Sequence, residues 1–340
     1  MSIRTILSIF AFFLMLTLLP TAGWAAKTVW NFNVWGPKRA FTKGIEVTKE
    51  MMEAAMGDQF ELRINYGDAL GPRRQNLDSI LIRAFEAATT CVGYHPNKLP
   101  LLSVMELPFL LPGDLIARAR VEIAVLNHPD IKKEMASRWN VRFLAPGLLP
   151  PYEFMGNKRI ANTADMKGVK MRISGLNALA LKEFGAVPTM VTAPEGYQAL
   201  DRGTIDSFGF PWTYAFGSYK LYEVSKYATV GMAMSGFMCL NVVSIDSYNA
   251  LPDNMKRKMK DIQWAAVLQM KKAYEVADKK WLPIFKKRLE VIKFPASERA
   301  KLVATAGKIW AQWEREQNKK GRPGTQILSF VKAQVAKYAP

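Results

Sequence analysis

The residues that most often carry catalysis do not form a recognisable catalytic pattern in this chain. No Gly-x-Ser-x-Gly nucleophile elbow, His-Glu-x-x-His zinc motif, phosphate-binding Gly-x-x-x-x-Gly-Lys-Ser/Thr loop or dinucleotide-binding Gly-x-Gly-x-x-Gly loop occurs. The two histidines, His95 and His128, do not stand at metal-ligand spacing from a cysteine. Carboxylate pairs leave no motif, so an enzyme stays an alternative. The absences nevertheless favour a binding protein, and we expect no cofactor.

The charge balance is the next chemical feature. The 340 residues include 47 Lys and Arg against 29 Asp and Glu, which gives a net charge of +18. This balance attracts anions and leaves nucleic acid, anionic lipid and small carboxylates open. The basic residues are scattered along helix-like segments, such as 256–258 and 286–288, with acids between them. A solvated helix face is the favoured interpretation, and we expect no nucleic acid as a partner.

Residues 1–26 have the pattern of a secretory signal. Arg4 is followed by an apolar run over residues 6–19 and then by a proline and small residues. The run is shorter than the ~20 residues that span a bilayer, so cleavage after Ala25 or Ala26 is favoured over an uncleaved anchor. We expect a periplasmic protein of a Gram-negative cell. Its net charge would be +17, because Arg4 is the only charged residue removed.

Composition and cysteine content describe a large globular protein. Hydrophobic residues make up 49% of the chain, and its 18 Phe, 11 Tyr and 9 Trp require burial, which excludes a disordered chain. Two cysteines cannot provide a disulfide scaffold for this length. Cys91 and Cys239 lie in strand-like apolar runs and could pair in an oxidising compartment. Buried thiols are the favoured interpretation, since the sequence does not fix the distance that a disulfide needs.

Strand-like and helix-like segments alternate and predict two successive α/β units followed by a helical end. The first unit has strands near 29–34, 60–64 and 88–92, with helices over 41–56 and 75–85. The second has strands near 169–173, 187–191 and 204–208, with helices over 176–184 and 194–203. The end has helices over 254–280, bent or ended at Pro283, and over 297–317 and 325–337. A cleft between two such domains is a common place for a small ligand.

Five segments in order resemble the solute-binding proteins of TRAP transporters, the DctP-type family. Residues 165–175 read D-M-K-G-V-K-M-R-I-S-G and resemble the family's D-x-K-G-x-K-x-R. The other matches are E-L-P-F-L at 106–110, F-G-A-V-P at 184–188, E-G-Y-Q-A-L-D-R-G-T-I-D at 195–206 and K-L-Y-E-V-S-K-Y at 220–227. The similarity covers essentially the whole chain after residue 26.

The resemblance implies a two-domain α/β periplasmic binding protein with an interdomain cleft, hinge strands and a long domain-spanning helix. One domain would comprise 27–148 with about 238–275, the other 149–237 with about 276–340 and the C-terminal helices. Such a protein is not an enzyme; it delivers a small organic acid to the small and large integral membrane components of a TRAP transporter. In the family, the Arg of the first motif pairs with the solute carboxylate, which implies that role for Arg172. Its planar guanidinium suits bidentate carboxylate binding.

Two departures from the family pattern predict an aromatic pocket. After Asp206 the family commonly has G-Q-E-N-P, whose Asn contacts the carboxylate, and here Phe210 stands at that position. By count, Tyr152 replaces a second Arg of sialic-acid-type members. Rings in place of polar groups favour a ring-bearing or apolar ligand. The alternative interpretation for each of these aromatic side chains is that it packs in the core and does not contact the ligand. The pocket candidates are Phe210, Trp212 and Tyr152, and then Tyr94, Phe237 and Trp35.

The hypothesis that follows is a monocarboxylate with a hydrophobic or aromatic body, such as a benzoate-like or phenylpropenoate-like acid. A small aliphatic dicarboxylate or an oxo acid is the alternative, and an exported enzyme acting on organic acids is the third. Members that bind 2-oxo acids through a metal carry a carboxylate near the hinge, whereas residues 234–238 read M-S-G-F-M. We therefore expect no metal. Glu153 and Glu195 are candidates for polar contacts, although Glu195 suits a helix N-terminus better.

Overall fold

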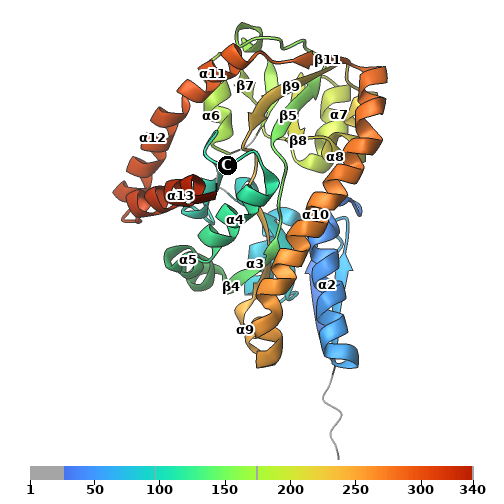
Figure 1. Cartoon of the computed structure of the whole chain (residues 1–340), viewed down its shortest axis with the longest axis vertical. Coiled ribbons are helices and arrows are strands. Elements are labelled where there is room, and N and C mark those ends of the chain that lie inside the picture. The colour runs from blue at the N-terminus through green and yellow to red at the C-terminus, as the bar shows by residue number, and fades with distance from the viewer. Residues whose placement is uncertain (1–26, 96, 174, 339–340) are drawn as a thin grey trace, which may run out of the picture.

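The computed structural model describes residues 27–95, 97–173 and 175–338. Two β-sheets lie one above the other in Figure 1, each with helices around it, and one long helix runs past both. The predicted α/β fold with two domains is therefore confirmed. The predicted signal segment, 1–26, lies outside the described residues. Within the described ranges, no helix is both long and apolar enough to cross a membrane.

The first lobe contains a five-stranded sheet in the order β2-β1-β3-β10-β4. Strand β1 pairs in parallel with β2 and β3, whereas β10 is antiparallel to both of its neighbours, β3 and β4. Alternation predicts β1 well, because Trp30 and Phe32 are buried on the same face. The strands are β1 (Thr28–Asn33), β2 (Phe60–Asn65), β3 (Ala87–Cys91), β4 (Val141–Pro146) and β10 (Cys239–Ser244).

The second lobe contains a six-stranded sheet in the order β11-β9-β5-β8-β6-β7. Strand β5 is antiparallel to β8 and β9, while β6 is parallel to β7 and β8. The strands are β5 (Tyr152–Gly156), β6 (Lys170–Arg172), β7 (Val187–Pro188), β8 (Ser207–Pro211), β9 (Tyr227–Met234) and β11 (Glu290–Lys293).

The chain crosses between the lobes in two short strand connections. Residues 147–151 join β4 to β5, and residues 235–238 join β9 to β10. Because both connections leave one sheet and enter the other, they form the expected hinge. Each lobe is thus assembled from segments that are distant in sequence.

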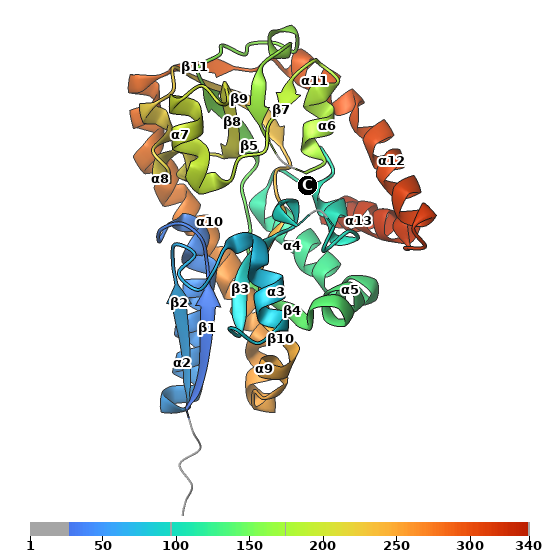
Figure 2. The same cartoon turned by 180° about the vertical axis from the view of Figure 1, so that it is seen from behind.

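The long helix α10 (Asp253–Arg288) packs on α2, β4 and α4 of the first lobe and on α8 and β11 of the second. Figure 2 shows it passing behind both lobes. Of the two predicted effects of Pro283, an end of the helix was wrong, because the helix continues to Arg288, and a bend stays a prediction. Packing offsets the missing proline N–H: Trp281 and Phe285 stack at 6.2 Å across the proline, and Phe285 is fully buried.

The remaining helices surround the sheets. The predicted helix over 297–317 is interrupted at Thr305 and forms α11 and α12, while α13 packs against α4 in the first lobe, rather than on the second lobe with which the sequence grouped it. The helices are α2 (Lys43–Met56), α3 (Asn76–Leu81), α4 (Leu115–Leu126), α5 (Pro129–Trp139), α6 (Asn177–Lys182), α7 (Gly196–Asp201), α8 (Tyr214–Ser218), α9 (Ile245–Asn249), α11 (Ala296–Ala304), α12 (Ala306–Lys319) and α13 (Gly324–Tyr338). Short 3₁₀ turns include η4 (Val92–Tyr94) and η5 (Leu102–Glu106).

Candidate functional site

A small aromatic cavity lies between the lobes, next to the hinge. It forms where strands end: Trp35 follows β1, Tyr94 follows β3, and Phe237 lies in the crossing that enters β10. Strand ends meet at one edge of an α/β sheet, which is where such folds place ligands. The eight lining rings are Trp35, Phe41, Tyr94, Tyr152, Phe210, Tyr214, Tyr219 and Phe237.

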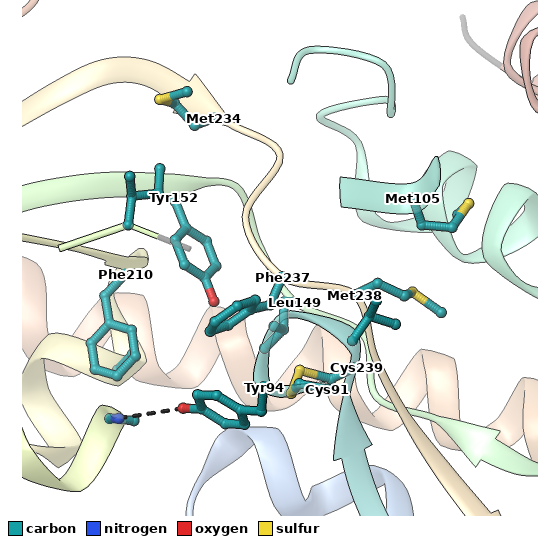
Figure 3. Close-up of a cluster of buried hydrophobic side chains, with 14 of the residues drawn as sticks. Cys91, Tyr94, Met105, Leu149, Tyr152, Phe210, Met234, Phe237, Met238 and Cys239 are labelled. Atoms are coloured by element: carbon teal, nitrogen blue, oxygen red, sulfur yellow. Dashed lines mark hydrogen bonds between the residues drawn. A yellow bond between two sulfur atoms is a disulfide. The ribbon is translucent and has the colours of Figure 1, made fainter. Parts of the chain in front are cut away.

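The rings of the cavity contact one another across the lobes. Tyr94 of the first lobe packs 5.0 Å from Phe237 in the hinge and 5.7 Å from Trp35, centroid to centroid. Tyr152 of the second lobe lies 6.3 Å from Phe237 and 6.4 Å from Phe210, both edge-on. Figure 3 shows the rings of Tyr94, Tyr152, Phe210 and Phe237 around a common centre. Five predicted pocket residues (Trp35, Tyr94, Tyr152, Phe210 and Phe237) are thus brought together.

Arg172 is completely buried at the end of β6, directly behind this aromatic wall. Its Nε and Nη1 donate to the carbonyls of Val191 and Gly209, each at 2.9 Å. Its guanidinium carbon lies 5.3 Å from the Phe210 centroid and 5.2 Å from that of Phe237. Arg172 does not itself line the cavity, and its Nη2 has no hydrogen-bond partner within the described residues. A buried cation with an unpaired donor is stabilised when an anionic ligand binds next to it.

Arg39 is the charged residue of the cavity lining, and the sequence reasoning missed it. Its Nη1 donates to the carbonyls of Trp35 at 2.8 Å and Pro37 at 2.7 Å. Its guanidinium stacks over three rings, with Phe41 nearest at 5.1 Å and Tyr219 at 5.7 Å. The sequence did offer a signal for Arg39 as a pocket residue, because it stands four residues after the pocket candidate Trp35, just beyond the end of β1.

Tyrosine hydroxyls supply the neutral polar groups of the cavity. Burial raises the pKa values of Tyr152 and Tyr219 above the ordinary range, so both stay protonated donors at neutral pH. The Tyr94 hydroxyl accepts the backbone N–H of Ala193 at 3.3 Å. The Tyr219 hydroxyl is buried without a partner in the part of the chain that the structure describes. It is therefore available to donate to a bound carboxylate.

Trp212 and Glu153 lie away from this cavity, although the sequence reasoning grouped them with it. Both line a separate groove beside α10. Trp212 packs on Phe216 and Phe285, and the Glu153 carboxylate accepts the N–H groups of Met232 and Ala233. Burial raises the pKa of Glu153 to about 7. Strand alternation explains the placement, since Tyr152 faces the cavity and its neighbour must face the other side.

Three contacts close the lobes over the cavity. Arg39 of the first lobe stacks on Tyr219 of the second, and Tyr94 bonds Ala193 across the same gap. Nearby, Nη1 of Arg73 donates to Oγ1 of Thr192 at 3.2 Å. The structure therefore represents the closed arrangement of the two lobes.

Cys91 and Cys239 form a disulfide, so the favoured expectation of buried thiols was wrong. The two residues stand directly opposite each other in the β3–β10 pair, with Cα atoms 4.0 Å apart. The sequence could not reveal this pairing, because it depends on the insertion of β10 beside a strand that is 148 residues earlier. Both cysteines also line the aromatic cavity.

A buried carboxyl group, Glu106, joins the hinge to both lobes. Its Oε1 accepts the N–H of Gly93 at 2.8 Å and that of Met238 at 3.1 Å. Burial raises the pKa of Glu106 to about 8, against the opposing effect of these two N–H donors. A methyl group on Gly175 of the second lobe would collide with Oε2 of Glu106, which shows how closely the lobes meet here.

No group of three or more His, Cys, Asp or Glu side chains gathers in a metal-binding arrangement within the described ranges. Our expectation of no metal stays a prediction.

Residues 33–317 match the family model of bacterial extracellular solute-binding proteins, family 7 (DctP). A solute-binding protein of Verminephrobacter eiseniae is 27% identical over 213 residues, 61% of this chain and 62% of that protein, so less than two thirds of its length is spanned. A monocarboxylate 2-oxoacid-binding periplasmic protein of a Nostoc species is 26% identical over 263 residues, 76% of this chain and 69% of that protein.

A similar solved structure is that of a TRAP solute-binding protein from an unidentified marine microbe, specific for aromatic acid ligands and bound to 3-hydroxybenzoate. It has a TM-score of 0.80 and 21% identity and covers 93% of this chain and 100% of its own. At this identity the likeness establishes the fold alone.

Proposed function

We propose, from the premise that this chain belongs to the DctP family of bacterial extracellular solute-binding proteins, that its solute is an aromatic monocarboxylate. As a member of this family, the chain is a solute-binding protein and not an enzyme. What remains to be assigned is the class of solute, and the cavity between the lobes supports that assignment.

The observation that carries the proposal is a cavity walled by eight aromatic rings, with Arg39 in its lining and Arg172 directly behind Phe210 and Phe237. No carboxylate lines this cavity among the residues that the structure describes. Aromatic walls bind a ring through burial and edge-to-face contacts.

The carboxylate of the solute would bind on the side formed by Phe210 and Phe237. The guanidinium of Arg172 lies just behind these rings and has a free Nη2, and a shift of either ring would bring it against the carboxylate. The unpartnered hydroxyl of Tyr219 and the guanidinium of Arg39 add donors from the other side. Charge-assisted hydrogen bonds of this kind are about twice as strong as neutral ones.

The proposed setting is the periplasm, after removal of residues 1–26. There the closed, loaded protein would dock on the small and large membrane components of a TRAP transporter. The family supports this assignment, since its members are extracellular solute-binding proteins.

Calorimetric titration tests the solute class. The purified protein is titrated with benzoate and 3-phenylpropenoate, and separately with succinate, malate and pyruvate. We expect clear preference for the ring-bearing acids. Preference for succinate or malate would overturn the proposal, because the proposal assigns both arginines to a single carboxylate.

A 2-oxo acid is the second candidate, favoured by the likeness to the Nostoc protein. A small oxo acid would leave most of the ring surface of the cavity without contacts. Tight binding of pyruvate together with weak binding of benzoate would establish this alternative.

The anchor is tested by Arg172→Ala. Loss of one partner of a buried, hydrogen-bonded charge pair costs about 2–5 kcal/mol, so benzoate affinity should fall about thirtyfold or more. The matched control is Arg142→Ala, because Arg142 also stacks on a ring, that of Tyr248, but lies in the first lobe outside the cavity. Unchanged affinity in Arg172→Ala would place the anchor elsewhere, with Arg39→Ala as the next variant.

A further inference from the structure

The disulfide between Cys91 and Cys239 is part of the cavity wall. Both cysteines line the cavity, and the side chains are only 1% and 2% exposed. Figure 3 shows the bridge beside the ring of Tyr94 and below Phe237, on the same side of the cluster. A disulfide that served only as a staple within the sheet would not need to face the ligand space.

The same bridge fixes the two segments that carry these rings. Tyr94 follows Cys91 by three residues in η4, and Phe237 precedes Cys239 by two residues at the end of the hinge crossing. The rings of Tyr94 and Phe237 pack 5.0 Å apart. A methyl group on Gly93, which lies between Cys91 and Tyr94, would overlap the Phe237 ring. The bridge therefore joins the two segments within three residues of both rings, where the segments already lie in close contact.

We infer that the Cys91–Cys239 disulfide is a positioning element of the solute site: it holds Tyr94 and Phe237 against the bound solute, and the bound solute in turn shields it from reduction. The inference rests on the proposed function, because it takes this cavity as the place of the solute. By linkage, a bridge that strengthens solute binding must itself be stabilised by the solute.

The chemistry of reduction makes shielding measurable. One thiolate of a dithiol reagent attacks a sulfur of the bridge and forms a mixed disulfide, and the other cysteine leaves as a thiolate. The second thiol of the reagent then displaces the remaining cysteine, so that the protein gains two thiols and the reagent becomes a cyclic disulfide. Since both cysteines are buried and line the cavity, the attacking thiolate reaches them through the cavity after the lobes open.

The first experiment follows reduction of the full chain by dithiothreitol, with and without saturating benzoate. Aliquots are quenched by alkylation, and the modified cysteines are counted by mass spectrometry. We expect benzoate to slow reduction about tenfold or more, while succinate at the same concentration leaves the rate unchanged. The rate should not respond to low urea concentrations, because access comes from lobe opening and not from unfolding.

The second experiment measures benzoate affinity of Cys91→Ala/Cys239→Ala. Without the bridge, the solute must immobilise the rings of Tyr94 and Phe237 when it binds, so we expect its affinity to be about tenfold weaker. The measurement is made at a temperature at which circular dichroism shows the variant to be folded. The control is Leu251→Ala, which removes a buried side chain of the first lobe far from the cavity. It should lose stability but keep the affinity.

Each outcome decides between the two claims. The positioning role would be overturned if benzoate binds but does not slow reduction of the disulfide, or if the double variant binds benzoate with full affinity. Either result would leave the proposed function intact. Failure of benzoate to bind the wild-type chain would instead overturn the proposed function, and the positioning role with it.

Discussion

At the scale of single residues, the buried carboxyl of Glu106 has consequences for the whole protein. It is 1% exposed, it accepts two backbone N–H groups, and it contacts the opposite lobe at Gly175. Among titratable groups, Tyr152 lies close enough for Glu106 to affect its pKa, and Glu316, Lys320 and Arg322 line the adjoining groove. Burial without a cationic partner makes the charged form of Glu106 unfavourable.

Stability should therefore fall as the pH rises. The pKa of Glu106 is about 8 in the folded protein and near 4.5 in the unfolded chain. Below 4.5 both states are protonated, and between the two values only the folded state keeps the proton. The free energy of unfolding then decreases from about pH 4.5 to about pH 8, and Glu153, with a folded pKa of about 7, adds to the decrease.

Urea unfolding of Glu106→Gln at pH 5, 6, 7 and 8 checks this expectation. The amide oxygen can still accept from Gly93 and Met238, while the charge is removed. The variant should be more stable than the wild type at pH 8 and should show a weaker pH dependence. Glu316→Gln, at an exposed carboxyl beside the same groove, is the control and should behave as the wild type. An undiminished pH dependence in Glu106→Gln would contradict the assignment.

The residues of the site were only partly predictable from the sequence. Replacement of polar family positions by rings identified Tyr152 and Phe210, because those positions already lay in a matched motif. Glu153 was misplaced although strand alternation, applied to Tyr152, would have turned it away. Arg39 was missed although it stands near Trp35, because no single segment shows that the chain after β1 meets Tyr219 of the other lobe.

At the scale of elements, the long helix α10 contains a proline in its interior, Pro283, which disfavours the helical conformation. A proline inside a helix costs about 3 kcal/mol or more through the lost hydrogen bond and the clash with the preceding turn. We expect Pro283→Ala to raise the free energy of unfolding by roughly 1–3 kcal/mol in urea titrations, with benzoate affinity unchanged. A loss of stability would mean that the packing of Trp281 and Phe285 depends on the proline.

The elements show what local patterns can and cannot predict. Alternation located β1 and β2 within a residue or two, because each carries buried side chains on one face. Strand β3 is buried on both faces, and its short apolar run located it equally well. The continuation of α10 through Pro283 could not be predicted, since it depends on tertiary packing around the proline, such as that of Phe285 on Trp212 and Tyr222. The disulfide was missed for a related reason: strand order is a property of the whole sheet, and no local pattern sets Cys239 opposite Cys91.

At the scale of the whole molecule, a basic groove lies beside the cavity and shares Arg39 and Tyr214 with it. The groove is lined by Lys38, Lys43, Lys272 and Lys280, against a single acid, Glu46, which pairs with Lys38 at 3.3 Å. A positive approach to a site raises the association rate of an anion, and salt screens the effect.

Stopped-flow measurements of benzoate binding test this effect. Association should slow as ionic strength rises, and Lys272→Gln/Lys280→Gln should slow it about two- to fivefold at low salt, with dissociation unchanged. Lys132→Gln/Lys133→Gln, at two exposed lysines of α5, removes the same charge away from the groove and should have little effect. Equal slowing in both double variants would indicate net charge, and not the groove, as the cause.

The position of β10 between β3 and β4 has a consequence for biosynthesis. A chain that leaves the ribosome N-terminus first has made β1 to β4 long before it makes Cys239–Ser244, yet β3 and β4 pair only through β10. The first sheet therefore cannot be completed until more than two thirds of the polypeptide has been synthesised, and β4 stays separate from β1, β2 and β3 until then. Pairings this distant in sequence form slowly, so the nascent chain has time to remain unfolded and competent for translocation.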